Sequence, residues 1–192
     1  MKRVFLTSLL LFSWVTAKTY ALDADTQNEV PPFEKPYLEI GYKSVGEALK
    51  ECEAINQREL QLPIKLPPMP FTHHLGRCIN DQGDHNDQLQ IEYLHEARGK
   101  NHYNIDVRPI EQRMDFENSK RGKKKYKLND GSEAIYFTTK TTKTGGGFNV
   151  LAFDKNGWQY LLSVDSRIGN QVTADVLVGI AESVVQTRTQ LD

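Results

Sequence analysis

The chain has 192 residues, with 24 lysine and arginine residues against 25 aspartate and glutamate residues, so its formal net charge is −1. This balance argues against a protein that is attracted as a whole to nucleic acid or to an anionic membrane surface. The length fits one domain behind a leader, and the hydrophobic fraction of 39% is modest but sufficient for one core.

Residues 1–21 are predicted to be a signal peptide. Two basic residues precede an apolar run from Val4 to Val15, and cleavage is expected after Ala17 or Ala21. The run is too short to cross a bilayer as a helix. We therefore expect a bacterial protein that is secreted or held in the cell envelope, with no stable membrane span after cleavage.

Residues 22–37 are acidic and contain three prolines, which fix φ and remove backbone donors, so we expect a linker. A single domain is predicted to follow over residues 38–188. Ser44 and Glu47 have the spacing of a capping box, in which each side chain accepts a hydrogen bond from the other residue's backbone N–H. They indicate the start of a helix that ends near Asn56.

Residues 60–71 contain four prolines and are predicted to be extended, so that they would form an edge if they border a sheet. Period-two alternation of apolar residues then predicts five or six strands. They are expected at residues 89–93, 103–107, 126–128, 134–137, 148–153 and 158–164. Asp130-Gly131 and the run from Asp154 to Gly157 are hairpin signals.

The last two predicted strands are apolar on both faces, which indicates central strands that a helix covers on one side. Thr173 is a good N-cap for that helix, and an apolar stripe at helical spacing follows it from Leu177 to Val184. We therefore expect an α+β fold: an antiparallel meander sheet of five or six strands, with one helix before it and one after it.

Cys52 and Cys78 are the two cysteines of the chain. In an exported protein, a pair of cysteines favours a disulfide. The alternative is that each is a small buried hydrophobic residue. A catalytic Cys–His pair is disfavoured because no active-site signature flanks Cys78.

Several of these features follow one another in a known order. They are the serine-led helix with Glu47 and Ala48, the proline-spaced Leu62–Pro67, Ile91 with Tyr93, Gly131 with Ala134, Asn156–Tyr160 and Ile180–Ser183. This order resembles the domain-of-unknown-function family 4367 over residues 44–186. The resemblance implies a non-enzymatic bacterial module in a cell-surface setting, and no catalytic residue comes with it.

One basic cluster stands out in the sequence. It consists of Lys120, Arg121, Lys123, Lys124, Lys125 and Lys127. Clustered cations would attract an anionic cell-wall polymer in a salt-dependent manner. The alternative is a set of solvated lysines that keeps a hairpin edge soluble. Nucleic acid is disfavoured because no aromatic residues are interleaved with the cations.

Candidate metal ligands lack the spacing that metal sites use. His73 and His74 would point to opposite faces of an extended segment, and His85 stands apart from them. Asp81, Asp84 and Asp87 do not follow the order of a calcium-binding loop. Gly145–Gly147 precedes a strand and not a helix, so a hairpin tip is favoured over a phosphate-binding loop.

Five aromatic residues could line a groove, but at strand spacing they more often form a core. They are Tyr136, Phe148, Phe153, Trp158 and Tyr160.

No motif of a hydrolase or metalloprotease occurs. We therefore expect a non-catalytic binding module at the cell envelope, without a cofactor, whose partner is an anionic wall polymer or an envelope protein. The alternatives are a metal-assisted hydrolase that uses His73, His74 or His85, and a structural or sporulation component of the envelope.

Overall fold

The computed structural model describes residues 32–80, 86–117, 122–139 and 146–185. These residues belong to a unit that runs from Pro31 to Asp192. The predicted signal peptide and residues 22–31 of the predicted linker lie outside the described residues.

Helices precede and follow a block of strands, as an α+β fold requires. In chain order the elements are α1 (Lys35–Glu39), α2 (Val45–Asn56), β1 (His73–Ile79), β2 (Gln88–Leu94), β3 (His102–Pro109), the 3₁₀ helix η1 (Ile110–Gln112), β4 (Lys123–Lys127), β5 (Glu133–Thr138), β6 (Phe148–Lys155), β7 (Trp158–Asp165), the 3₁₀ helix η2 (Ser166–Ile168) and α3 (Ala174–Ala181).

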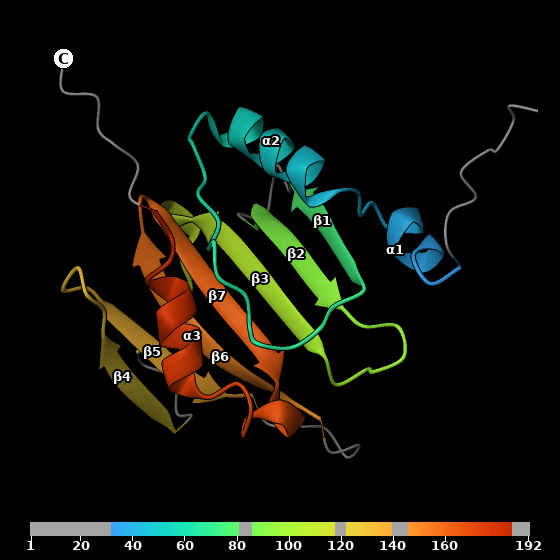
Figure 1. The fold of residues 1–192 in the computed structure, drawn as a ribbon. Helices are drawn as coiled ribbons and strands as arrows, with labels where there is room; N and C mark the ends of the chain where they lie inside the picture. The colour runs from blue at the N-terminus through green and yellow to red at the C-terminus, as the bar shows by residue number, and fades with distance from the viewer. Residues whose placement is uncertain (1–31, 81–85, 118–121, 140–145, 186–192) are drawn as a thin grey trace, which may run out of the picture. The chain divides into compact units, whose positions relative to one another are not determined.

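The strands form one antiparallel sheet in the order β1-β2-β3-β7-β6-β5-β4 (Figure 1). The α+β fold is thus confirmed, but the prediction of five or six strands is wrong, because β1 is a seventh strand. The order is also more than a simple meander. Two meanders, β1–β3 and β4–β7, meet where β3 pairs with β7 in the middle of the sheet.

Helix α1 begins inside the predicted linker, at Lys35. Pro36 lies in its first turn, where a missing backbone N–H costs no helical hydrogen bond. Proline therefore marks the start of a short helix here, where the sequence predicted a chain without regular structure. The next residues bring Lys43 to the edge of β1, where it forms an isolated bridge with Gly76.

Helix α2 begins with the predicted capping box, in which Ser44 and Glu47 each accept a hydrogen bond from the other's backbone. The helix packs closely on β1. A Cβ atom at Gly76 would lie 2.8 Å from the Cβ atom of Ala48, so only glycine fits this position without movement. A disulfide joins Cys52 of α2 to Cys78 of β1, with 5.5 Å between their Cα atoms, and confirms the predicted pairing.

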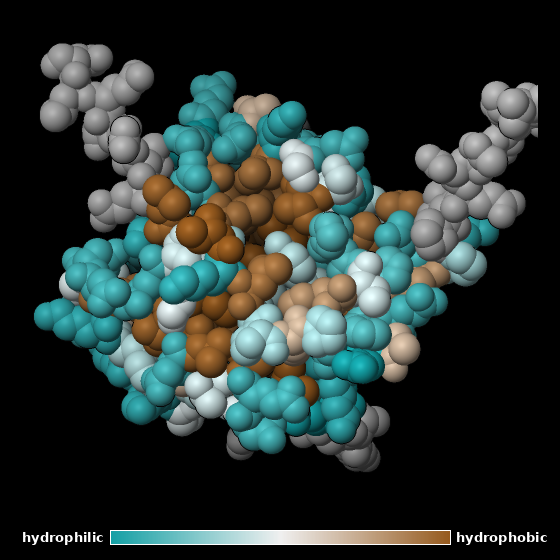
Figure 2. Space-filling model, viewed as in Figure 1, coloured by the Kyte–Doolittle hydropathy of each residue, from teal (hydrophilic) through white to brown (hydrophobic). Residues whose placement is uncertain are grey.

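The proline-containing segment between α2 and β1 crosses the face of the sheet that carries the helices (Figure 1). Two side chains of β7 hold it there. The Trp158 indole donates to the carbonyl oxygen of Glu59 at 2.9 Å, and the Tyr160 hydroxyl donates to that of Gln61 at 2.8 Å. Figure 2 shows hydrophobic residues at the surface between α2 and α3 on this face.

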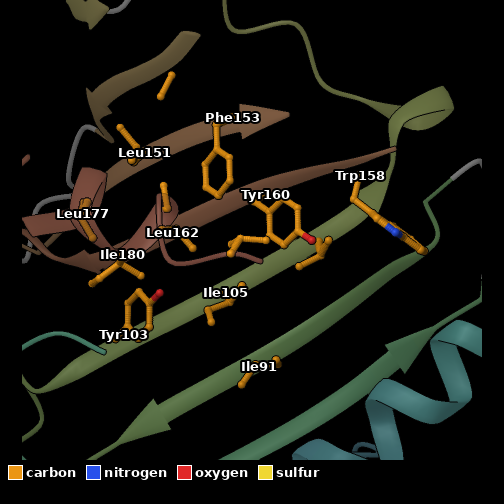
Figure 3. Packing of buried hydrophobic residues seen from close by; sticks show 14 of the residues in the cluster. Ile91, Tyr103, Ile105, Leu151, Phe153, Trp158, Tyr160, Leu162, Leu177 and Ile180 are labelled. Atoms are coloured by element: carbon orange, nitrogen blue, oxygen red, sulfur yellow. The ribbon is translucent and has the colours of Figure 1, made fainter. Parts of the chain in front are cut away.

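The core lies between the sheet and these covering elements (Figure 3). Helix α3 contributes Leu177 and Ile180, which are almost fully buried. Its cap is the predicted Thr173, whose side chain accepts from the backbone N–H of Val176. Every residue of β7 is buried, which fits the central position predicted from its apolar composition.

The turn between β6 and β7 is the predicted hairpin. Asn156 and Gly157 both have positive φ, at 54° and 80°. This is the backbone that a tight two-residue hairpin turn requires, and asparagine followed by glycine adopts it readily.

Candidate functional site

The sheet face opposite the helices carries a cluster of polar side chains on β1, β2 and β3. The register places Arg77 beside Gln90 and Gln90 beside Asp106, while Glu92 lies beside Asn104. Because side chains alternate along a strand, all of these point away from α2 and α3. We call the following eight residues the polar patch: Arg77, Gln88, Gln90, Glu92, His102, Asn104, Asp106 and Arg108.

Arg77 anchors one side of the polar patch. Its guanidinium donates to Gln90 Oε1 at 2.5 and 3.2 Å and to the carbonyl oxygen of Ile40 at 3.0 Å. The same guanidinium lies over the ring of Tyr42, 4.6 Å from its centroid. The Tyr42 hydroxyl in turn reaches Glu92 Oε1 at 3.4 Å. These bonds fix the orientation of the β2 side chains before any ligand arrives.

Glu92 is the most connected carboxylate of the patch. His102 Nε2 lies 2.6 Å from Glu92 Oε2, so a protonated His102 would form an ion pair with it. Burial and the neighbouring Glu92 charge together raise the pKa of Tyr42 to about 12. Tyr42 therefore stays a neutral hydrogen-bond donor throughout the physiological pH range.

Asp106 of β3 lies beside Gln90 of β2 and interacts electrostatically with Arg108 of its own strand and with Arg77 of β1. Burial, and then the charge of Glu92, raise its pKa to about 6, against the opposing effect of Arg108. A carboxyl group with such a pKa exchanges its proton near neutral pH. The charge of the polar patch is therefore sensitive to pH in that range.

Two atoms of the polar patch are buried and have no hydrogen-bond partner in the described part of the chain. They are Arg108 Nε and Asn104 Oδ1. Arg108 is only 8% exposed, and its Nη2 donates to Gln88 Oε1 at 2.9 Å. Buried polar groups are nearly always paired in folded proteins, so such orphans point to a water molecule or a ligand.

The segment after η1 crosses the same face and bounds the patch. Gln159 of β7 exchanges two hydrogen bonds with the backbone of Met114, at 2.8 and 3.0 Å. Phe116 then stacks on Phe137 of β5 with 5.0 Å between ring centroids. Beyond this segment the face is apolar, with Val150 and Leu161 among the buried residues of a second cluster.

The predicted polyanion site lies largely on the edge strand β4. Lys123, Lys125 and Lys127 alternate with Lys124 and are all exposed, whereas Lys120 and Arg121 lie outside the described residues. Two glutamates face this strand: Lys125 is 2.8 Å from Glu133 and 3.5 Å from Glu117. The charge of this cluster is thus partly offset.

The histidines lie as the strand geometry predicts. The ring of His73 lies tilted against that of Phe33, and its Nε2 is 3.9 Å from Glu34 Oε1, whereas His74 lies beside Tyr93 of β2. Within the described ranges, no three His, Cys, Asp or Glu side chains are grouped closely enough to hold a metal ion. Asp81, Asp84, His85 and Gly145 lie outside those ranges, and Asp87 is engaged by Gln112.

Three of the five aromatic residues belong to the core. Phe153, Trp158 and Tyr160 are at most 2% exposed, and the rings of Phe153 and Tyr160 stack at 5.0 Å. Tyr136 is partly buried against the core, and Phe148 lies on the other face, where its ring meets His102 edge-on at 5.2 Å. These aromatics thus form no common groove.

The sequence matches no family model, and comparisons with curated proteins and with solved structures find no significant match. The resemblance to family 4367 therefore stays a prediction. None of the described helices has the length and apolar character needed to cross a membrane.

Proposed function

We propose that the chain is an exported, non-catalytic binding module of the bacterial cell envelope, and that the polar patch is its ligand contact. The observation that carries the proposal is the pair of buried, unpartnered atoms in the patch, Asn104 Oδ1 and Arg108 Nε. Both atoms are closed to solvent in the free protein, so a ligand that turns these side chains outward and bonds to them would recover a hydrogen-bonding capacity that the folded chain leaves unused.

The chemistry of the patch favours a ligand rich in hydroxyl or amide groups. Amide, guanidinium, imidazole and carboxylate side chains stand side by side, so donors and acceptors alternate over a short distance. Such a surface can bond both the hydrogen and the oxygen of one hydroxyl group. Polysaccharides of a cell wall offer many groups of this kind.

Two further features support an envelope setting. The N-terminal 21 residues have the organisation of a signal peptide. The disulfide between Cys52 and Cys78 is a bond that persists outside the cytoplasm. In this setting the lysines of β4 would add a long-range attraction to an anionic polymer.

Sedimentation with purified bacterial cell wall tests the proposal. The mature protein is expected to sediment with the wall at low and at high salt, because hydrogen bonds are screened little by salt. Asn104→Val keeps a strand-forming side chain but removes both amide atoms, and should weaken wall binding about tenfold. Asn104 Oδ1 is unpartnered in the free protein, and Nδ2 makes a long hydrogen bond to Asp106 Oδ2 at 3.5 Å, so the same variant should lose little stability.

Two double variants, which each remove two positive charges, measure what the β4 lysines add to wall binding. Lys123→Gln/Lys127→Gln should weaken binding at low salt only, and Lys35→Gln/Lys50→Gln, at exposed positions elsewhere, should not. A parent protein that stays in solution at both salt concentrations would overturn the proposal. Undiminished binding by Asn104→Val would show that the patch is not the contact.

A further inference from the structure

A cleft of about 500 Å³ opens where three segments far apart in the sequence meet. One wall is the proline-containing segment at Pro68–Pro70, the second is the loop between β2 and β3, and the third is the stretch from Ile168 to Gln171. None of its lining residues belongs to the polar patch. The volume lies in the range of sites that bind small molecules.

The walls of the cleft are held by hydrogen bonds within and between segments. The Asn101 side chain donates to the carbonyl oxygen of Pro70 at 3.1 Å and joins two of the walls. Backbone bonds from Arg98 to His95 and from Asn101 to Arg98 close the loop between the strands. The third wall is closed by a backbone bond from Gln171 to Ile168 at 2.8 Å. A site whose walls are already fixed loses little entropy when a ligand binds.

The lining combines an apolar floor with positive charge. Met69 is partly buried and Ile168 is 5% exposed, so they form the inner surface. Arg98 and Lys100 are exposed, and within the described residues neither forms an ion pair with a carboxylate. None of the described residues that line the cleft is acidic. Its charge is therefore positive and offset by nothing in the lining.

We propose that this cleft binds a small organic anion with an apolar body, of the class of aliphatic carboxylates. The apolar body would cover Met69 and Ile168, and the carboxylate would lie between the two cations. Burial of methylene groups supplies most of the affinity. The cations select the anion over a neutral molecule of the same shape.

Titration with octanoate tests the proposal, with octanol and octyltrimethylammonium as neutral and cationic probes of the same chain length. Binding is followed by the NMR signals of the Asn101 and Gln171 side-chain amides, which lie in the cleft wall. We expect octanoate to shift both signals saturably, and the other two probes to bind several times more weakly. Equal binding of octanol, or no shift with octanoate, would overturn the proposal.

Two double variants test whether the positive charges of the cleft are needed for binding. Arg98→Gln/Lys100→Gln should weaken octanoate binding about three- to tenfold, the effect of losing two exposed charge interactions. Lys35→Gln/Lys50→Gln removes the same charge from exposed positions outside the cleft lining and should leave binding unchanged. If both double variants lost octanoate binding equally, the net charge of the protein would explain the loss, and the proposal that Arg98 and Lys100 bind the carboxylate would be overturned. Wall sedimentation should be the same for both, which keeps this site separate from the polar patch.

Discussion

The hydroxyl group of Tyr160 donates a hydrogen bond to the main-chain carbonyl oxygen of Gln61, with 2.8 Å between the two oxygens. The two residues are 99 positions apart, so this bond fastens a segment without helix or strand to the central strand of the sheet. Tyr160 is fully buried, and burial raises the pKa of its phenol. The hydroxyl thus remains a donor at any pH at which the protein is folded.

Tyr160→Phe removes this donor and leaves the Gln61 carbonyl without it. We expect the free energy of unfolding to fall by about 1–2 kcal/mol, the usual result of leaving a buried acceptor unpaired. Urea denaturation measures the change. Tyr93→Phe is the matched control, because no hydrogen bond of the Tyr93 hydroxyl is described, and it should change stability much less. Equal losses in the two variants would contradict this role of Tyr160.

Asp106→Asn should change how stability depends on pH. Burial raises the pKa of Asp106 from 3.8 to about 6, so between these values the folded chain keeps a proton that the unfolded chain has released. The stability that this group contributes therefore falls as the pH rises from 4 to 6, and the loss is complete above 6. The variant should gain about 3 kcal/mol over the parent near pH 7.5 and less than about 1 kcal/mol near pH 4.

The difference in the free energy of unfolding between Asp106→Asn and the parent is taken at each pH, because groups far from Asp106 titrate alike in both proteins and drop out of the difference. The charged neighbours Glu92, Arg108 and Arg77 stay in place in both proteins. Urea unfolding at several pH values between 4 and 7.5 gives the difference curve. A flat difference over that range would show that the carboxyl group titrates normally in the folded protein.

Cys52→Ser/Cys78→Ser opens a loop whose ends are 26 residues apart. Loss of a cross-link over this length lowers the free energy of unfolding by about 3 kcal/mol in the chain-entropy estimate. The measurement is urea unfolding of the variant beside the parent, with and without a reducing agent. Reduction should lower the stability of the parent to that of the variant and leave the variant unchanged. If a reducing agent left the stability of the parent unchanged, this expectation would be contradicted.

Gly76→Ala tests the close approach of α2 to β1. The new Cβ atom would lie 2.8 Å from the Cβ atom of Ala48 and 3.0 Å from the Cα atom of Val45, so the helix must move away from the sheet. We expect a loss of about 2 kcal/mol in thermal or urea unfolding. Gly46→Ala, within α2 and with nothing in contact range, should instead gain up to about 1 kcal/mol. If both variants lost stability, the cause would be the backbone conformation of the two glycines and not the close packing of α2 on β1.

Local signals in the sequence predicted the elements that local chemistry determines. The capping box at Ser44 and Glu47 predicted the start of α2, and Asn156-Gly157 predicted the tightest hairpin. Strand β1 has no such signal. On the helical face, α2 lies so close to Gly76 that no side chain fits there, and the neighbouring position on that face is the polar His74. The alternation of apolar residues is therefore missing, and the sequence predicted five or six strands where the sheet has seven.

The polar patch could not be read from the sequence for a different reason. Polar residues that alternate along a strand, such as Gln90 with Glu92 and Asn104 with Asp106, are also what a solvent-exposed face looks like. Only the register between β2 and β3 shows that Asp106 lies near Glu92 and that Asn104 is left without a full set of partners. The cleft could not be predicted from the sequence either, because its three walls come from distant segments that only the fold brings together.

The pairing of β3 with β7 sets the order in which a nascent chain can complete its core. Strands β1–β3 and the disulfide can form early, because they lie close together in the sequence. The hydrophobic row of β3, which includes Ile105 and Val107, then lies beside an unpaired strand edge until β7 has been made. A chain that stalls before Trp158 would present that edge to its neighbours, and aggregation would compete with folding.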